Sequence, residues 1–186
     1  MIVVIIHGYG GEPMRGFRPW LKAELEAKGF AVSVPAMPSP NEPRVDEWVA
    51  AIGREIGEAE DDCILVGHSL GCIAILRYIE RAKKKVAGAV MVAGFAGKLG
   101  GEFSILDNFF APQLDFERVK EMCPKFVAIF SDNDPYVPVS QEKIFREKLG
   151  AATMVLHARG HFSSSEGTVK LPEALQAVLR IAPHTL

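Results

Sequence analysis

The stretch CILVGHSLGC, residues 63 to 72, decides how the chain folds. Its apolar residues run up to Val66, a Gly-x-Ser-x-Gly pattern follows, and the chain then becomes apolar again. A buried strand that turns sharply into a buried helix produces this order of residues. Glycine is expected at Gly67 and Gly71, because a side chain at either position would collide with the neighbouring strand or helix.

Ser69 lies between these glycines, and the stretch alone leaves two interpretations of it open. Serine often caps the helix that follows it. Ser69 could instead be a nucleophile, held clear of the sheet in a strained backbone conformation, with the N-terminus of the next helix favouring a developing oxyanion. The residues that follow the other strands decide between the two.

Short apolar runs rich in Val and Ile recur along the chain, separated by stretches with helical spacing. The runs span residues 2–6, 30–34, 63–66, 87–93, 126–130 and 153–157, and the helical stretches span 20–28, 46–58, 70–82, 140–149 and 172–181. Several runs lack alternation, which is typical of strands covered on both faces. We therefore expect one α/β domain over residues 1–186, with about six mostly parallel strands and helices on both faces.

Two segments interrupt this rhythm. Residues 35–45 hold four prolines, which predicts an irregular surface loop. Residues 94–125 are longer than an ordinary connection and contain the aromatic residues Phe103, Phe109 and Phe110. We expect a small lid or pocket rim there, and a plain surface excursion with its own small core is the alternative.

The composition excludes several classes of protein. Of 186 residues, 48% are hydrophobic and 24% charged, and the formal net charge is -2, so no basic footprint for nucleic acid or an anionic membrane is present. No apolar run is long enough to span a membrane, and residues 1–11 lack the features of a signal peptide. The three cysteines show no metal-ligand spacing. These features predict a cytoplasmic protein with reduced thiols and without a metal or organic cofactor.

Polar residues and glycines follow four of the apolar runs directly. The first run leads into HGYGG at residues 7–11, the third into Ser69, the fifth into SDNDP at 131–135 and the sixth into GHF at 160–162. Because ligands bind at the carboxyl ends of strands in open α/β sheets, we expect these residues to meet at one edge.

A serine, an aspartate and a histidine in this chain order are typical of a nucleophile elbow and its partners. Ser69 is the expected nucleophile, and His161 the general base that takes its proton and returns it to the leaving group. Asp134, which precedes a rigid Pro-containing turn, is the expected orienting acid. Asp132 is the alternative acid, but we expect it to cap that turn.

The developing oxyanion requires two backbone N–H donors. Leu70, directly after the nucleophile, is expected to supply one, and Tyr9 in the HGYGG loop the other, with Gly10 as the alternative. HGYGG fits neither a Walker loop nor G-x-G-x-x-G, which argues against nucleotide binding. We expect the substrate pocket to be lined by Gly10, His68, Phe95, Tyr136 and Phe162.

The remaining histidines and the cysteines have weaker claims. His157 falls within the sixth apolar run, and His184 lies in the C-terminal tail. His7 is expected to make a structural hydrogen bond. Cys63 and Cys72 flank the elbow, but neither replaces Ser69, so we expect both to pack in the core.

With these residues in place, the chain resembles the α/β-hydrolase-fold serine hydrolases, specifically the small family of retinoblastoma-binding protein nine. The resemblance runs nearly end to end, through GFAVSVPAMPSP, DEWV, GHSLGCIAILRYIE, MCP, SDNDPYVP and GHFSSSEG. It implies a compact α/β-hydrolase fold with little or no cap and a triad at Ser69, Asp134 and His161. HGYGG departs from the form of that loop in the vertebrate member, and the retinoblastoma-protein association is not carried over.

We therefore expect a serine hydrolase that cleaves small-molecule carboxylic esters, thioesters or amides through an acyl-enzyme. The aromatic residues near the predicted pocket favour an apolar acyl or aryl group. An acyltransferase, a lyase or an aminopeptidase-like enzyme could use the same triad. A protein-interaction module on the same scaffold is a further alternative, which the intact Ser, Asp and His argue against; no feature identifies a protein partner.

Overall fold

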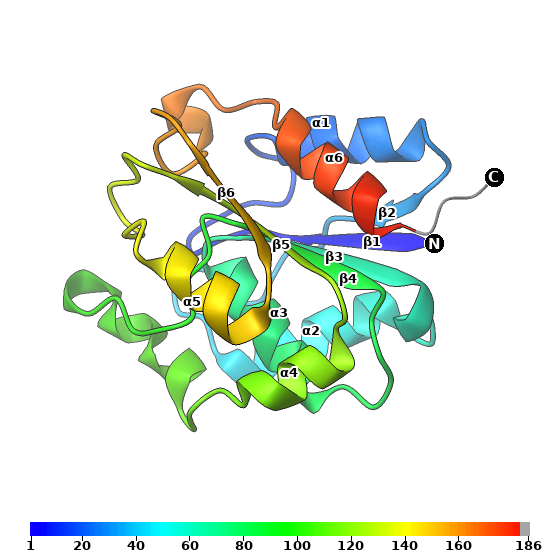
Figure 1. Ribbon diagram of the computed structural model, residues 1–186, viewed down its shortest axis with the longest axis horizontal. Helices are drawn as coiled ribbons and strands as arrows, with labels where there is room; N and C mark the ends of the chain where they lie inside the picture. Colours follow the sequence, from blue (N-terminus) through cyan, green and yellow to red (C-terminus); the bar gives the residue numbers. More distant parts are fainter. Residues whose placement is uncertain (183–186) are drawn as a thin grey trace.

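The strand that carries the elbow, β3 (Cys63–His68), lies inside a six-stranded parallel sheet with the order β2-β1-β3-β4-β5-β6. The computed structural model describes residues 1–182 (Figure 1). All residues of β3 are buried, and the strand pairs with β1 (Ile2–Ile6) and β4 (Gly88–Val92). The sheet is completed by β2 (Ala31–Ser33), β5 (Phe126–Ser131) and β6 (Ala152–Leu156).

Helices cover both faces of this sheet (Figure 1). One face carries α1 (Arg18–Glu26) and α6 (Pro172–Ile181). The other carries α2 (Val45–Ile56), α3 (Leu70–Arg81), α4 (Phe116–Met122) and α5 (Gln141–Leu149). Alternate residues of each inner strand enter the two cores: Ile64 and Val66 pack with the α1 and α6 side, Cys63 and Leu65 with the other. Burial on both sides explains why the strand sequences do not alternate.

The sequence-based expectation of an α/β fold with about six mostly parallel strands is confirmed. The predicted strand and helix ends coincide with the observed ones or differ from them by one or two residues. The missed elements are α4 and three 3-10 segments: η1 (Glu60–Asp62), η2 (Gly101–Phe110) and η3 (Ser164–Glu166). A 3-10 segment has no 3.6-residue apolar period to detect. For α4 a local signal exists, since Asp115 caps it by accepting a hydrogen bond from the Arg118 N–H at 2.9 Å.

Residues 94–125 form an excursion that includes η2 and α4 and projects on the side of the sheet that carries α5 (Figure 1). Arg77 of α3 is buried, and its Nε donates to the Phe109 carbonyl at 2.7 Å. The Asn108 side chain accepts from the Val45 N–H at 2.8 Å. Leu106 and Phe109 are buried in the core. The second half of η2 is therefore fastened to α2 and α3. No helix within residues 1–182 is long and apolar enough to span a membrane.

The elbow has the tight geometry expected from its glycines. A Cβ at Gly67 would lie 2.8 Å from the Cys72 amide nitrogen, and one at Gly71 would lie 2.6 Å from the Ile6 carbonyl oxygen. Ser69 has φ 54° and ψ -120°, a conformation that a residue with a side chain rarely adopts. The predicted need for glycine and the predicted strain at Ser69 are both confirmed.

Replacing Gly71 by alanine is therefore expected to lower the free energy of unfolding by about 1–3 kcal/mol or more, because α3 must move away from β1. Denaturant unfolding monitored by circular dichroism measures this change. Gly97→Ala is the matched control, since the nearest atom would be 3.9 Å from the added Cβ and its backbone is not left-handed. Equal stability of the two variants would contradict the packing argument.

Candidate active site

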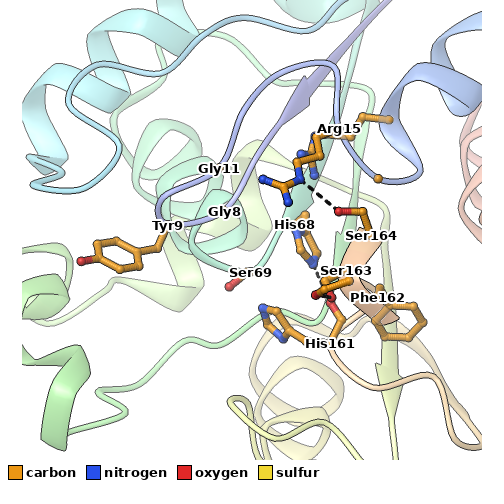
Figure 2. A pocket seen from close by; sticks show the side chains of 13 residues that line it. Gly8, Tyr9, Gly11, Arg15, His68, Ser69, His161, Phe162, Ser163 and Ser164 are labelled. Carbon is orange, nitrogen blue, oxygen red and sulfur yellow. Dashed lines mark hydrogen bonds between the residues drawn. The ribbon is translucent and has the colours of Figure 1, made fainter. Parts of the chain in front are cut away.

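The carboxyl ends of four strands bring the predicted residues to one edge of the sheet. Ser69 lies in the turn between β3 and α3, Asp134 follows β5, and His161 follows β6. The loop at residues 7–11 follows β1 and passes beside Ser69 (Figure 2). Figure 2 shows the Ser69 hydroxyl and the His161 imidazole facing each other across the opening of a cavity.

His161 and Asp134 form a short, largely buried pair. The His161 Nδ1 donates to the Asp134 Oδ2 at 2.8 Å, and the two side chains are 11% and 2% exposed. The other carboxylate oxygen of Asp134 accepts from the N–H groups of Tyr136 and Val137, at 2.9 and 3.0 Å. Because the carboxylate can only accept, it fixes the neutral imidazole with its proton on Nδ1 and leaves Nε2 as a base.

The structure places Asp132 differently from our expectation. Asp132 does not cap the turn at residues 134–137, because Asp134 itself accepts those N–H groups. Asp132 instead accepts from the Ala158 N–H at 2.8 Å and from the His157 Nδ1 at 2.6 Å, and these hydrogen bonds lower its pKa. β6 ends at Leu156, so His157 lies just beyond the strand, with its side chain 91% exposed. Asp132 is thus paired with a surface histidine and not with His161.

The backbone of His161 is held on both sides. The His68 Nε2 donates to the His161 carbonyl at 2.8 Å, and burial, followed by the nearby His161, lowers the pKa of His68 well below its usual value. The His161 N–H donates to both carboxylate oxygens of Glu166, at 3.0 and 2.8 Å. Our sequence analysis missed Glu166. The S-x-x-E spacing of Ser163 and Glu166, which form a capping box at η3, is the signal that could have located it.

The backbone N–H groups of Tyr9 and Leu70, both beside Ser69, donate to no protein acceptor within residues 1–182. The Gly10 N–H donates to the Pro40 carbonyl at 2.8 Å, so it is already occupied. Gly8 lies against the nucleophile, because a Cβ there would be 3.0 Å from the Cβ of Ser69. The N–H groups of Tyr9 and Leu70 are therefore available to a ligand beside Ser69, whereas that of Gly10 is not.

The proline-containing loop at residues 35–45 supports the loop at 7–11, a role that its composition did not reveal. In addition to the Pro40 contact, the Met37 N–H donates to the His7 Nε2 at 3.1 Å. The His7 Nδ1 donates to the Gly8 carbonyl at 2.8 Å, which is the structural hydrogen bond expected of it. Burial is the main cause that lowers the pKa of His7, which favours this neutral form.

Two cavities open on either side of Ser69 and share Tyr9, Ser69 and His161. The first, the polar cavity, has about 190 Å³ and is also lined by Gly8, Gly11, Arg15, Gly16, Arg18, His68, Phe162 and Ser163 to Ser165 (Figure 2). The second, the apolar cavity, has about 320 Å³ and is also lined by Phe95, Leu99, Glu102, Phe103, Leu106, Tyr136 and Val137.

The predicted pocket residues divide between these cavities. His68 and Phe162 line the polar cavity, whereas Phe95 and Tyr136 line the apolar cavity. Gly10 lines neither of the two, because its backbone turns toward Pro40. The excursion at residues 94–125 contributes much of the apolar wall.

The cysteines do not have the properties of a nucleophile. Cys72 and Cys123 are buried, which raises the pKa of Cys72 far above its usual value and that of Cys123 to about 12. A thiol with so high a pKa is a poor nucleophile at neutral pH. Within residues 1–182, no cluster of three or more His, Cys, Asp or Glu side chains could hold a metal ion. His184 lies outside the described residues.

Known proteins are similar to this chain in sequence. The family model described as serine hydrolase matches residues 3–180. The putative hydrolase YdeN of Bacillus subtilis is 34% identical over 172 residues, which cover 91% of this chain and 90% of that protein. The serine hydrolase RBBP9 of Rattus norvegicus is 29% identical over 166 residues, 88% of each chain.

Solved structures extend the comparison. The crystal structure of the Bacillus subtilis ydeN gene product superposes with a TM-score of 0.91 over 97% of both chains, at 32% identity, and confirms the expected α/β-hydrolase fold. A structure described among carboxylesterases of Nitrososphaera gargenis shares the fold alone, with a TM-score of 0.72, 16% identity and coverage of 97% of this chain and 90% of that one. Since the family model spans almost the whole chain and YdeN is more than 30% identical over most of it, the chain belongs to the serine hydrolase family.

Proposed function

We propose that this hydrolase cleaves carboxylic esters, thioesters or amides of small molecules through an acyl-enzyme formed on Ser69. The observation that carries the proposal is the His161 imidazole, which is hydrogen-bonded to Asp134 at 2.8 Å through Nδ1 and faces the Ser69 hydroxyl with its other side. A base oriented by a carboxylate and turned toward a strained serine is the arrangement that activates a hydroxyl for attack.

The proposed reaction has two steps, acylation of Ser69 and hydrolysis of the acyl-enzyme. His161 Nε2 takes the Ser69 proton as Oγ bonds to the carbonyl carbon, and then gives that proton to the departing oxygen, sulfur or nitrogen. Water then enters and loses a proton to His161 as its oxygen bonds to the acyl carbon. His161 returns this proton to the departing Ser69 Oγ, so the acyl group leaves as the acid and the free serine is restored. In both steps the N–H groups of Tyr9 and Leu70 donate to the oxyanion, and Asp134 stabilises the imidazolium.

The apolar cavity is suited to an acyl or aryl group of the substrate. Phe95, Phe103 and Leu106 form its wall within the excursion at residues 94–125. We therefore propose that this excursion acts as a pocket rim. The second half of η2 is fixed to α2 by the Asn108 hydrogen bond and to α3 by Arg77.

A fluorophosphonate probe tests the nucleophile directly. The folded wild type is expected to be labelled and to release p-nitrophenol from p-nitrophenyl esters, because only an activated serine reacts with both reagents. Ser69→Ala is expected to lose labelling and to lower kcat by about 10⁴-fold or more. Labelling is measured by intact-mass spectrometry, and labelling of Ser69→Ala equal to that of the wild type would exclude Ser69 as the nucleophile.

The two aspartates give a ranking that distinguishes their roles. Asp134→Asn is expected to lower kcat by roughly 10³–10⁴-fold, because an amide that donates to Nδ1 stabilises the wrong tautomer of His161. Asp132→Asn is the matched control and is expected to change kcat little, since its partner is the exposed His157. Steady-state kinetics on one ester measures both variants, and the reverse ranking would assign the role to Asp132.

Glu166 is expected to make stability depend on pH. Burial raises the pKa of Glu166, but hydrogen bonds from the Ser163 hydroxyl and from the N–H groups of His161 and Ser163 outweigh it, so the pKa lies below its usual value of 4.5. A group whose pKa is lowered by folding stabilises the protein above its unfolded pKa, and this contribution is lost as the pH falls through the folded pKa.

Glu166→Gln is therefore expected to be less stable than the wild type at pH 7. The difference in unfolding free energy is expected to shrink as the pH falls below the usual value of 4.5 and through the lower pKa of the folded state. Urea unfolding at a series of pH values measures this difference. Glu58→Gln is a surface control. A difference that stays constant with pH would show that the charge of Glu166 does not hold the His161 backbone.

A further inference from the structure

Arg18 places a buried positive charge in the wall of the polar cavity. The residue is only 6% exposed, and its Nε and Nη2 donate to the carbonyls of Pro13 and Glu12 at 3.0 and 2.7 Å. No carboxylate within residues 1–182 forms an ion pair with it. Burial, followed by the charge of Arg15, lowers the pKa of Arg18 to about 10. The Glu12 carboxylate acts in the opposite direction on this pKa, but it forms no ion pair with Arg18. Two neutral carbonyls and a carboxylate without an ion pair compensate a buried cation only in part, so the site is favourable to an anion.

Arg15 brings a second guanidinium to the same cavity. Figure 2 shows it above the cavity, with its Nε donating to the Ser164 hydroxyl at 3.1 Å. Among the ion pairs of residues 1–182, none involves Arg15. The charge of Arg15 disfavours the charge of Arg18, and an anion placed between the two guanidinium groups would offset that repulsion.

The remaining polar groups of the cavity can also donate to an anion. Ser164 and Ser165 present hydroxyls at its wall, and each hydroxyl can donate as well as accept. Two carboxylates lie nearby, but neither lines the cavity. Glu166 accepts from the backbone of His161 and Ser163, and the side chain of Glu12 does not line the cavity.

The two sides of Ser69 therefore differ in charge. The polar cavity carries Arg15 and Arg18, whereas the apolar cavity carries aromatic residues and one acid, Glu102. A substrate that spans Ser69 would match both sides if it were anionic at one end and apolar at the other.

We propose that the polar cavity is a subsite for an anionic group, a carboxylate or a phosphate, which the substrate carries on one side of the carbonyl attacked by Ser69. Arg18 and Arg15 bind the anion, and the apolar cavity receives the other end of the molecule. This inference rests on the proposed hydrolysis at Ser69 for its kinetic test, and it has a binding test that needs no turnover.

Matched pairs of esters test the preference for an anion. On the leaving-group side the pair is m-carboxyphenyl butyrate and phenyl butyrate, together with the phosphate analogue of the first. On the acyl side the pair is the p-nitrophenyl monoester of adipic acid and p-nitrophenyl hexanoate. The anionic member of at least one pair is expected to have a kcat/KM roughly tenfold higher, as charge-assisted hydrogen bonds to arginine provide. The pair that shows this ratio identifies the side, and the phosphate analogue identifies the favoured anion.

Variants assign the preference to the two arginines. Arg15→Gln removes an exposed charge and is expected to lower the anionic-to-neutral ratio by about threefold. Arg18→Gln removes a buried charge and is expected to lower the anionic-to-neutral ratio of kcat/KM by roughly tenfold, to about one. Arg54→Gln, an exposed arginine on the opposite face of the sheet, is the control and is expected to retain the ratio. If Arg18 only holds the carbonyls of Glu12 and Pro13, its replacement lowers both members of a pair equally, which overturns its role in the subsite.

Binding separates a failure of this inference from a failure of the proposed function. In Ser69→Ala, titration calorimetry with m-carboxyphenyl butyrate is expected to show tighter binding than with phenyl butyrate, and Arg15→Gln added to this variant is expected to reduce the difference. Equal kcat/KM within every pair, with neutral esters turned over, overturns the subsite and leaves the hydrolase proposal intact. Absence of turnover and of probe labelling overturns the hydrolase proposal, and the calorimetric difference then decides the subsite by itself.

Discussion

The close approach of α3 to β1 at Gly71 is the constraint on which the rest of the site depends. A Cβ at this position would lie 2.6 Å from the Ile6 carbonyl oxygen, and one at Gly67 would meet the backbone of Cys72. The chain can therefore pass from β3 into α3 only through a very tight turn, with Ser69 in a left-handed conformation at φ 54°. This turn raises the Ser69 side chain above the strand ends and leaves the Leu70 N–H at the start of α3 without a partner in its own helix.

The partners of Ser69 are placed by hydrogen bonds that cross between loops, and not by the sheet alone. The imidazole of His161 is oriented by Asp134, its carbonyl is held by His68, and its N–H is held by Glu166. Each of these residues comes from a different part of the chain: Asp134 from the loop after β5, His68 from the end of β3 and Glu166 from η3. A displacement of His161 is therefore opposed by three separate contacts. The loop at residues 7–11 is held in a comparable way by the backbone of Met37 and Pro40. Side chains locked by packing and by further hydrogen bonds can keep the reacting groups in a productive geometry.

The sequence predicted most of the fold, because buried parallel strands and amphipathic helices leave periodic apolar patterns. It also predicted which residues gather at the sheet edge, because that depends only on where each strand ends. It did not predict that Asp132 pairs with His157. Asp132 and Asp134 are only two residues apart, and the direction in which the turn points each side chain decides which histidine it meets. The contact of Arg77 with Phe109 escaped for a different reason: it joins residues far apart in a segment without a periodic pattern. Glu166 stands between these cases, because its capping-box spacing was visible but the hydrogen bond to His161 requires a folded loop.

The division between rigid and adaptable parts explains where substrate preference can arise in this protein. At the elbow, a Cβ added at Gly67 or Gly71 would lie less than 3 Å from neighbouring backbone atoms, so neither glycine can be replaced without moving α3 or β1. Much of the cavity walls comes instead from the loops after β1, β4, β5 and β6, which carry Arg15, Phe103, Tyr136 and Ser164. Loops tolerate changes in side-chain chemistry that a packed sheet does not. A shared hydrolase framework can thus present a cationic cavity on one side of Ser69 and an aromatic cavity on the other, and the selection of a substrate becomes a property of these loops and not of the fold.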